Sequence, residues 1–471
     1  MSAAPGSESN PLRVAIIGSG PSGFYAAEAL HKRDDVTVQV DMFDRLPTPF
    51  GLVRGGVAPD HQKIKSVTKA YDRIADHPEF RFFGNVEFGR DLAREDLAAY
   101  YHATIYAVGS RGDRRLGIPK DYLPGSHGAA EFVGWYNAHP DFRRLSFDFS
   151  HSAATVVGNG NVAMDVARVL ARSQAELRET DIADHALAAL AESAITDIYV
   201  LGRRGPAQAA FTLKELRELG QLEDAEVVVD PADLEFDETT TAWLRKNPDG
   251  QRDKILEVLR GYSDAPSRGA GKRIVFRFLV SPIEVVGDER VEGVEMARNA
   301  LHLSDDGSLR PRATDERETL DTGLVFRAIG YKGTALPDVP FDHRGGVIPN
   351  DCGRVTDGDQ PRVGEYCVGW IKRGPSGVIG TNKPDAVESV GALFADLDAG
   401  LLDHEVPTRA VLERLLNERS DVVGYEQWQL IDELEKQRGS AAGDRPRTKF
   451  SSVEEMLHAL AEASAPTSQA E

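Results

Sequence analysis

Leu12-Arg-Val-Ala-Ile-Ile-Gly18-Ser-Gly20-Pro-Ser-Gly23-Phe-Tyr-Ala-Ala-Glu-Ala-Leu30 is the stretch that decides the fold of this chain. The apolar run at its start predicts a buried parallel strand, and the Ala-rich part after Gly23 predicts a helix. The glycines follow the G-x-G-x-x-G spacing: Gly18 permits a tight turn, Gly20 lets a pyrophosphate approach, and Gly23 lets the helix pack closely on the strand. The helix N-terminus adds N–H donors and a positive dipole. The stretch therefore predicts a dinucleotide-binding unit.

The sequence that follows strengthens this interpretation. A second strand, predicted at residues 36–43, ends at Asp44, about 20 residues beyond Gly23, where a carboxylate can accept ribose hydroxyls. The alternative, a glycine-rich turn without a ligand, does not explain why the turn lies between a strand and a helix and is followed by an acidic strand end.

Length and composition limit the possible classes. The chain has 471 residues with 41% hydrophobic content, which is enough for two or more domains. Residues 1–10 are small and polar and do not resemble a targeting signal, and no apolar run approaches a membrane span, so we expect a cytoplasmic protein without a membrane partner. A net charge of −20 argues against nucleic acid as a partner.

The two cysteines, Cys352 and Cys367, form no C-x-x-C pattern. The pattern argues against a disulfide framework, an intrinsic iron–sulfur centre and a protein-bound metal site. A pyridine nucleotide–disulfide reductase would need a redox cysteine pair soon after the first glycine turn, and a glutamate-synthase-type subunit would need cysteine clusters. The sequence offers neither.

A second fingerprint, Gly158-Asn-Gly160-Asn-Val-Ala163, follows another predicted strand and precedes a long helix. It has the G-x-G-x-x-A form of the dinucleotide motif. The next predicted strand, residues 197–201, ends in Gly-Arg203-Arg204-Gly instead of a carboxylate. Two guanidinium groups can clamp a 2′-phosphate that a carboxylate would repel, so this site favours NADP(H) over NAD(H). The alternative is a solvated arginine pair in a loop.

The remaining segments give weaker predictions. The Pro- and Gly-rich loop 45–65 is expected to be ordered against a flat cofactor ring. A short helix at 211–219 carries Glu215 and Glu218 on one face, at least one of them expected to be solvated. Residues 221–272 are expected to form a helical surface excursion, and 274–286 with 290–299 a hairpin. Near residue 370 a strand enters a glycine-rich turn before a helix at 386–397, where Trp370 is either core or next to a cofactor ring.

With these residues placed, the chain closely resembles the adrenodoxin reductase family, and most of all its actinobacterial NADPH–ferredoxin reductase branch. The resemblance covers residues 12–395 and rests on GSGPSGFYAA, LPTPFGLVRGGVAPDHQKIK, FVGWYNAHP, GNGNVAMDVAR, GRRGPAQAAFTLKELREL and VGWIKRGPSGVIGTNK. It implies an α/β fold of the glutathione-reductase type, with two Rossmann-like dinucleotide-binding domains. The NADP domain, residues 111–334, would be inserted into an FAD domain made of residues 1–110 and 335–471.

The resemblance also implies roles for individual residues. Those implied at FAD are Gly18, Gly20, Ser22, Gly23, Asp44, Leu52, Phe88, Trp370, Gly377, Val378 and Ile379. Those implied at NADP are Arg114, Asn159, Gly160, Asn161, Val162, Arg203, Arg204 and Glu215, with Gly377 at the nicotinamide end.

Three residues match family positions proposed to act near the flavin–nicotinamide contact or in catalysis: His61, Glu218 and Asp165. The chain departs from the family pattern at two positions. Asp44 replaces the usual Glu and reaches one methylene less far, and Phe50 stands where close relatives carry Trp.

The implied function is an FAD-dependent ferredoxin–NADP(+) reductase. It would transfer a hydride from NADPH to FAD and then single electrons to a ferredoxin-type iron–sulfur protein. A downstream cytochrome P450 system and a monomeric state are further expectations. The alternatives are an NADPH-dependent flavin monooxygenase or oxidase, and a flavoprotein that binds nucleotides without catalysis.

Overall fold

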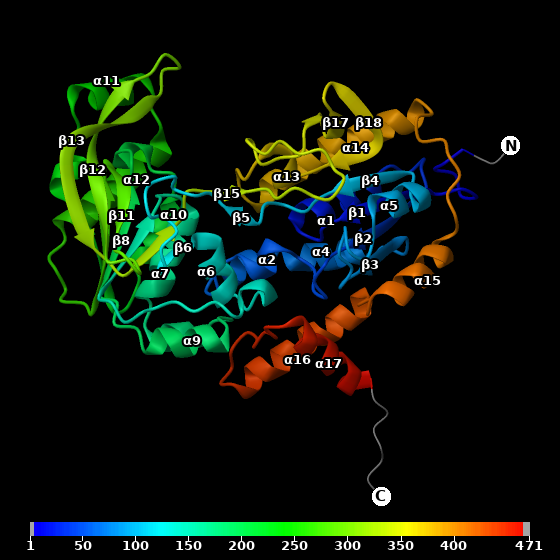
Figure 1. Cartoon of the computed structure of the whole chain (residues 1–471), viewed down its shortest axis with the longest axis horizontal. Coiled ribbons are helices and arrows are strands. Elements are labelled where there is room, and N and C mark those ends of the chain that lie inside the picture. The colour runs from blue at the N-terminus through cyan, green and yellow to red at the C-terminus, as the bar shows by residue number, and fades with distance from the viewer. Residues whose placement is uncertain (1–3, 465–471) are drawn as a thin grey trace, which may run out of the picture. The chain divides into compact units, whose positions relative to one another are not determined.

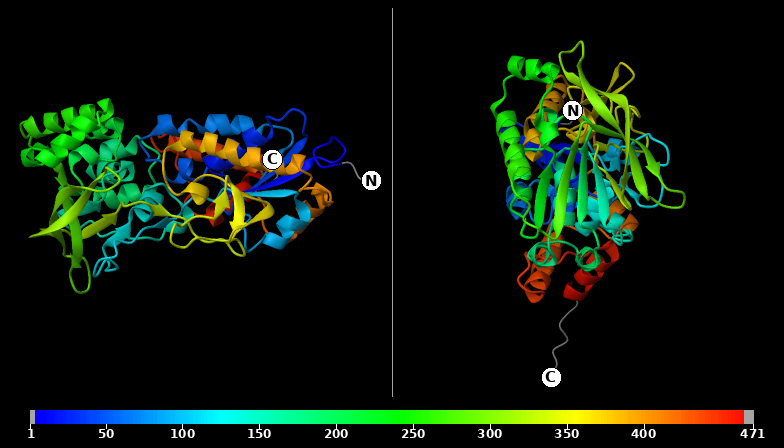
Figure 2. Two further views of the ribbon diagram at one scale, coloured as in Figure 1. Left: turned by 90° about the horizontal axis from the view of Figure 1, so that it is seen from above. Right: turned by 90° about the vertical axis from the view of Figure 1, so that its left-hand side faces the viewer.

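The computed structural model describes residues 4–464. Residues 1–3, part of the polar stretch used above to predict localisation, and residues 465–471 lie outside the described range. Within it, the chain divides into two compact units (Figures 1 and 2). The first contains residues 4–57, 61–112 and 331–464, and the second contains 58–60 and 113–330. The domain borders expected from the sequence follow residues 110 and 334. No helix in the described part is long and apolar enough to cross a membrane.

The first unit is built on a seven-stranded sheet in the order β16-β17-β18-β4-β1-β2-β3. β1 is central and parallel to β2 and β4, and β16 and β17 form an antiparallel edge. The strands are β1 (Leu12–Ile17), β2 (Val38–Phe43), β3 (Phe80–Phe83), β4 (Ala103–Tyr106), β16 (Asn350–Asp351), β17 (Arg354–Asp357) and β18 (Gln360–Cys367).

The central strand is buried on both faces, as expected of a parallel sheet covered by helices. Val14 and Ile16 join one hydrophobic cluster, and Ala15 and Ile17 join the cluster on the opposite face. The helices of this unit are α1 (Pro21–Leu30), α2 (Leu52–Gly55), α3 (Gln62–Lys65), α4 (Thr68–Ala75), α5 (Arg94–Tyr100), α13 (Trp370–Arg373), α14 (Asn382–Asp398), α15 (Arg409–Arg419), α16 (Tyr425–Ala441) and α17 (Val453–Ser464).

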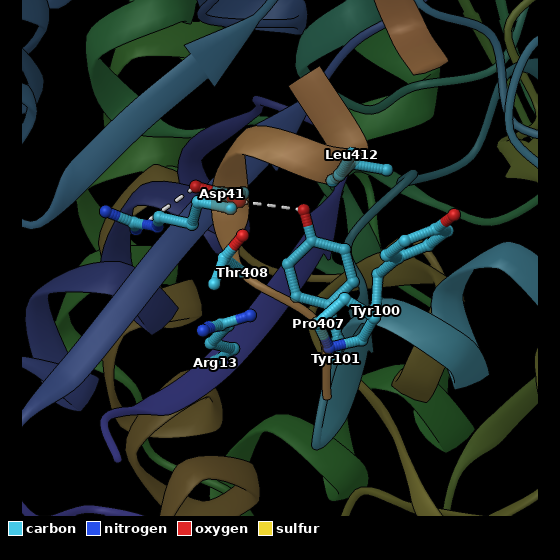
Figure 3. A pocket seen from close by; sticks show the side chains of 8 residues that line it. Arg13, Asp41, Tyr100, Tyr101, Pro407, Thr408 and Leu412 are labelled. Carbon is cyan, nitrogen blue, oxygen red and sulfur yellow. Dashed lines mark hydrogen bonds and ion pairs between the residues drawn. The ribbon is translucent and has the colours of Figure 1, made fainter. Parts of the chain in front are cut away.

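A buried ion cluster ties α15 to this sheet (Figure 3). Asp41, on β2, is 1% exposed and accepts hydrogen bonds from Arg81 and from the Tyr101 hydroxyl, both at 2.8 Å. Arg409, at the start of α15, adds an ion pair of 3.1 Å. Burial, together with the Asp41 carboxylate, raises the pKa of Tyr101 well above its ordinary value. The hollow between these side chains has no room for a water molecule, so Asp41 has a structural role.

The second unit contains a six-stranded parallel sheet in the order β6-β14-β7-β8-β10-β9. The right-hand view of Figure 2 faces this unit. The strands are β6 (Ser126–Gly128), β7 (Ala153–Val157), β8 (Asp197–Gly202), β9 (Ala225–Val229), β10 (Lys272–Phe278) and β14 (Leu324–Arg327). Its helices are α6 (Ala129–Tyr136), α7 (Asn161–Ala171), α8 (Gln174–Arg178), α9 (Asp184–Ala191), α10 (Leu213–Leu219), α11 (Glu238–Lys246) and α12 (Gly250–Asp264). Short strands β5 (Gly112–Asp113) and β15 (Tyr331–Lys332) mark where the chain passes between units.

The expected hairpin is only partly correct, because only the later part of the first predicted strand pairs with the second. The predicted strand 274–286 is two strands, because Leu279 takes a left-handed conformation with φ of 55°. β10 before it belongs to the parallel sheet, whereas β11 (Val280–Val286) pairs antiparallel with β12 (Gly293–Leu303), and β12 pairs with β13 (Leu309–Asp321). The 221–272 excursion contains α11 and α12 as expected, but also strand β9, which the sequence analysis missed.

Candidate cofactor sites

The glycine turn of the first unit contains two kinds of glycine. Gly18 has φ of 107°, and a Cβ there would lie 2.6 Å from the carbonyl oxygen of Ala107. A Cβ at Gly23 would lie 2.3 Å from the oxygen of Gly18. At Gly20, by contrast, a Cβ would meet nothing within 4 Å. Gly18 and Gly23 are therefore required by packing, and Gly20 leaves open space where the motif places a pyrophosphate.

Gly20 is also the N-cap of α1, and no side chain accepts a hydrogen bond from the first turn of that helix. The free N–H groups and the helix dipole favour an anion at this end. Ser22 lies in the same turn, but it is only 9% exposed, and a Cβ at Gly369 would lie 2.0 Å from its hydroxyl oxygen. The Ser22 side chain is thus covered by the chain just after β18.

Asp44 lies at the end of β2, as expected, and its carboxylate is held by the glycine turn. The main-chain N–H of Ser19 donates to it at 3.0 Å and the Ser19 hydroxyl at 2.5 Å. The N–H of Leu46 donates to its second oxygen at 3.0 Å. A carboxylate has about four lone-pair positions, so it retains capacity for a ribose hydroxyl. The shorter Asp side chain is therefore placed by Ser19.

The loop after Asp44 returns to the glycine turn. The N–H of Phe50 donates to the oxygen of Ser19 at 2.9 Å, and Phe50 has φ of 81°, a rare conformation for a residue with a side chain. Gly51 follows it, with its Cβ position only 3.0 Å from the Cα of Gly20. Phe50 is 5% exposed and packs in the core, whereas Leu52 is 37% exposed. The loop therefore presents Leu52, and not Phe50, outward beside the turn.

The segment around Trp370 forms a second open surface on this unit. The Trp370 indole stacks on Tyr331 at 5.6 Å between ring centroids, and its N–H donates to the oxygen of Ser376 at 3.2 Å. Gly377 has φ of 79°, and Val378 is 60% exposed. Ser376 and Gly377 belong to the lining of an open depression of about 400 Å³, together with Arg373, Thr381, Pro384, Asp385 and Glu388.

Two other predicted residues of this unit have packing roles in the structure. Ile379 is partly buried against the hydrophobic core. Phe88 is half-buried and contacts Tyr106 edge to face at 5.8 Å. The N-terminus of α14 carries Asp385 in its first turn, and this carboxylate accepts the N–H of Gly369 at 2.5 Å.

The glycine turn of the second unit repeats the pattern. Gly158 has φ of 137° and a Cβ position 2.3 Å from the oxygen of Ala328, whereas a Cβ at Gly160 would meet nothing within 4 Å. Gly160 caps α7, again without a side-chain cap. The side-chain N of Asn159 is buried and has no hydrogen-bond partner in the described part of the chain. An orphaned donor beside an open turn fits a pyrophosphate or ribose ligand.

The strand after this turn ends in two arginines without acidic partners. Arg203 is exposed and Arg204 half-buried, and no carboxylate within residues 4–464 forms an ion pair with either. Burial, and then the positive charges of Arg203 and Arg310, lower the pKa of Arg204. Nearby, both amide atoms of Gln208 are buried and have no partner among the described residues. This concentration of cations and unused polar groups suits a phosphate dianion.

Other predicted NADP residues frame the same turn. The side-chain oxygen of Asn161 accepts the N–H of Thr212 at 2.8 Å, and Val162 packs partly against the core. The exposed Arg114 donates its main-chain N–H to the oxygen of Gly330 at 3.1 Å.

Three predicted carboxylates of the second unit surround one arginine. Arg168, on α7, is 0% exposed and pairs with Asp165 at 2.7 Å, Glu215 at 3.1 Å and Glu218 at 3.7 Å. Asp60 adds a fourth carboxylate at 2.7 Å. Burial alone would lower the pKa of Arg168, but the charges of Asp165 and Asp60 raise it above its ordinary value. Glu215 is buried, with 6% of its surface exposed, whereas the side chain of Glu218 is 23% exposed.

His61 belongs to the first unit, where it is 8% exposed and precedes α3. Asp165 and Glu218 belong to the second unit. The structure therefore brings Asp165, Glu215 and Glu218 together within one unit, and the grouping of His61 with Glu218 stays a prediction.

Sequence reasoning missed several residues of these sites. Arg168 carried a usable signal, since it follows Asp165 by three residues and faces inward on a helix that is otherwise apolar there. Gln208 and Tyr331 carried none, because only the folded chain brings them to the sites.

Comparisons with known proteins support the dinucleotide-binding fold of the chain. A sequence profile described as pyridine nucleotide-disulphide oxidoreductase matches residues 12–200. That range contains no cysteine, so the match reflects the dinucleotide-binding fold and not a redox disulfide.

Individual relatives match almost the whole chain. The NADPH-ferredoxin reductase FprA of Mycobacterium tuberculosis is 46% identical over 459 residues, which cover 95% of this chain and 98% of the relative. The mitochondrial NADPH:adrenodoxin oxidoreductase of Arabidopsis thaliana is 42% identical over 475 residues, with 96% of each chain covered. A solved structure of Mycobacterium tuberculosis FprA in complex with NADPH has a TM-score of 0.91 and 45% identity, covering 96% of this chain and 100% of that one.

These findings confirm the family resemblance and the two-part Rossmann-like α/β fold predicted from the motifs. At 46% identity over 95% of its length, this chain belongs to the NADPH–ferredoxin reductase family, to which the adrenodoxin reductases are related.

Proposed function

We propose that the protein is an FAD-dependent NADPH–ferredoxin reductase. The observation that carries this proposal is the contrast between two similar glycine turns, one followed by Asp44 and the other by Arg203 and Arg204. A carboxylate suits the ribose of FAD, whereas a guanidinium pair suits the 2′-phosphate that distinguishes NADPH from NADH. The names and the cofactor of the relatives support the same assignment.

The first unit has the features that FAD requires. Open space at Gly20 and the uncapped N-terminus of α1 would receive the pyrophosphate, and Asp44, oriented by Ser19, would accept a ribose hydroxyl. Leu52, Trp370 and Val378 are exposed or half-buried on the surfaces that would face the ring system. Four further residues would contribute by shaping these surfaces: Ser22, Phe88, Gly377 and Ile379.

The second unit has the features that NADPH requires. Gly160 and the orphaned amide of Asn159 would receive the pyrophosphate, with Asn161 and Val162 at the start of α7. Arg203 and Arg204 would hold the 2′-phosphate. Arg114 and Glu215 would also contribute to the NADPH site, and Gly377 would lie at the nicotinamide end.

When bound, FAD accepts a hydride from NADPH and delivers the electrons singly to an iron–sulfur protein. The hydride step depends on holding two rings at near-attack distance, so the task of the surrounding residues is orientation more than proton transfer. His61 and Glu218 would orient groups near the reacting atoms. Asp165 would act through Arg168, with which it pairs at 2.7 Å.

The partner class follows from the family: a ferredoxin-type iron–sulfur protein. A downstream cytochrome P450, a monomeric state, a cytoplasmic location and the assignment of FAD to the first unit and NADP to the second are parts of the same proposal.

The test is an anaerobic titration of the purified protein, with the visible flavin spectrum followed during addition of NADPH or NADH. We expect NADPH to bleach the flavin at a far lower concentration than NADH, and subsequent addition of a ferredoxin to restore the oxidised spectrum. Failure of NADPH to reduce the flavin would favour a nucleotide-binding protein without catalysis. Substrate-dependent NADPH consumption with a hydroxylated product would favour a monooxygenase.

A further inference from the structure

We propose that Asn299, on β12, is a positioning residue that sets the arginine loop, residues 202–205, for a 2′-phosphate and thereby determines the preference for NADPH. This inference rests on the proposed function, because it assumes that Arg203 and Arg204 recognise NADPH. Asn299 lies far along the chain from both glycine turns.

The carbonyl of Arg203 is held by the Asn299 side chain. Asn299 is 4% exposed, and its amide nitrogen donates to the oxygen of Arg203 and to the hydroxyl of Ser281, each at 2.8 Å. Both amide hydrogens are thus used, one on the loop and one on β11. Its main-chain N–H donates to the oxygen of Leu279 at 2.7 Å, which fixes Asn299 itself.

The carbonyl of Arg204 is held by the same sheet. The N–H of Leu279 donates to it at 3.2 Å. The side chains of Leu279 and Leu301 each lie 3.8 Å from the Cβ position of Gly205, so they close the far side of the loop. The neighbouring strands β11 and β12, with Leu279 between β10 and β11, therefore hold the main chain at both arginines.

A local irregularity places Asn299 at the loop. The register of β12 against β13 shifts between Ala297 and Asn299. Shifts of this kind bend a strand and redirect its side chains, and they often lie beside functional sites. The hydroxyl of Thr314, on β13, donates to the oxygen of Arg298 at 3.0 Å and stabilises the irregular part.

Electrostatics explains why the loop needs support. Arg203 and Arg204 have no acidic partner within the described residues, and Arg310 from β13 brings a third positive charge close enough to act on Arg204. Like charges repel, and a loop free to move would separate them. Holding the arginines in place before the ligand arrives reduces the ordering that binding would otherwise require.

The expected effect is on the affinity for the 2′-phosphate alone. Loss of the Asn299 hydrogen bond in Asn299→Ala should weaken binding of a 2′-phosphorylated nucleotide roughly five- to tenfold. In turnover with NADPH, KM should rise by the same factor and kcat should stay unchanged. KM for NADH should not move, because NADH lacks the phosphate that the loop holds.

Calorimetry on the flavin-loaded protein separates this role from general destabilisation. The probes are 2′,5′-ADP, which carries the 2′-phosphate, and 5′-AMP, which does not. Asn299→Ala should bind 2′,5′-ADP more weakly and 5′-AMP as the unmodified protein does. Ser281→Ala, which removes only the group that orients the amide, should give a smaller loss of roughly twofold and provides a test even if Asn299→Ala folds poorly.

Asn137→Ala is the matched control. Asn137 is 1% exposed in the same unit, and its side-chain N donates to the oxygen of Val133 at 3.1 Å, away from the loop. It should lose stability without losing preference for 2′,5′-ADP. If Arg204→Leu abolishes that preference but Asn299→Ala and Ser281→Ala keep it, the positioning role is wrong and the proposed function stands. If the unmodified protein does not prefer 2′,5′-ADP, both are wrong.

Discussion

The two glycine turns of this molecule are packed in the same way, but the strands that follow them end in residues of opposite charge. In each turn, a Cβ at the first glycine would clash with a carbonyl oxygen, that of Ala107 at Gly18 and that of Ala328 at Gly158. A Cβ at the second glycine, Gly20 or Gly160, would meet nothing within 4 Å. In each, the helix that follows has no side-chain cap. The turns differ at the third motif position, Gly23 in the first and Ala163 in the second, and at the end of the next strand, which is acidic in the first unit and basic in the second. Packing therefore fixes the scaffold, and the choice of cofactor depends on residues outside it.

The largest effect should separate the two kinds of glycine. In Gly158→Ala, the new Cβ would lie 2.3 Å from the oxygen of Ala328, and the residue would have to keep φ of 137°. We expect a loss of more than about 3 kcal/mol in the free energy of unfolding, because strain and a main-chain clash combine. Urea unfolding of the whole protein measures this loss.

Gly160→Ala is the control for that comparison. Its Cβ meets nothing in the protein, so the free energy of unfolding should stay within about 1 kcal/mol of the unmodified value. Its affinity for nicotinamide nucleotides should nevertheless fall, because the methyl group occupies the open space. Equal stability losses in the two variants would contradict the division into packing and ligand glycines.

A second large effect concerns the buried carboxylates around Arg168 in the second unit. Arg168→Met should destabilise the protein by about 3–5 kcal/mol, because Asp60, Asp165 and Glu215 would lose their shared buried cation. Thermal or urea unfolding at neutral pH measures the effect. Raising the proton concentration should partly rescue the variant, since protonation neutralises the carboxylates left without a partner.

Arg172→Met is the control for Arg168. Arg172 is 21% exposed and contacts Asp60 at 2.9 Å and Glu176 at 3.2 Å. Its loss should cost only about 1 kcal/mol, because Arg172 is partly exposed to water and Asp60 keeps its ion pair with Arg168 at 2.7 Å. If the two variants lose equal stability, the burial of Arg168 does not explain its importance.

The elements that could be predicted from sequence are the ones with local causes. Glycine spacing, strand periodicity and the charge at a strand end all lie within one stretch of chain, and they correctly predicted both turns and the strands beside them. The break between β10 and β11 was missed because Leu279, where the positive φ occurs, is not a residue typical of turns. Arg168 and its pairing with Asp60, Asp165 and Glu215 were missed because this cluster depends on contacts between distant segments.

The smallest effect compares the units by their response to acid. Burial, and then the charges of His404 and Arg13, lower the pKa of His102 in the first unit from 6.5 to about 4. Its Nδ1 accepts the N–H of Arg13 at 2.9 Å, so the folded state holds the neutral ring. In the second unit burial also lowers the pKa of His127, so this residue too reduces the stability of the fold as pH falls. Burial raises the pKa of Asp113 to about 6, and protonation of this carboxyl increases stability as pH falls.

The sign of the His102 effect follows from which state binds the proton. The unfolded chain protonates His102 near pH 6.5 and the folded chain only near pH 4, so stability is present above pH 6.5 and is lost as pH falls toward 4. At pH 5.5 the loss from this residue should be about 1.4 kcal/mol. His102→Asn keeps an acceptor for the Arg13 N–H but cannot titrate. Urea midpoints at pH 7.5 and 5.5 should therefore differ less in this variant, and an unchanged difference would mean that His102 is not the titrating group.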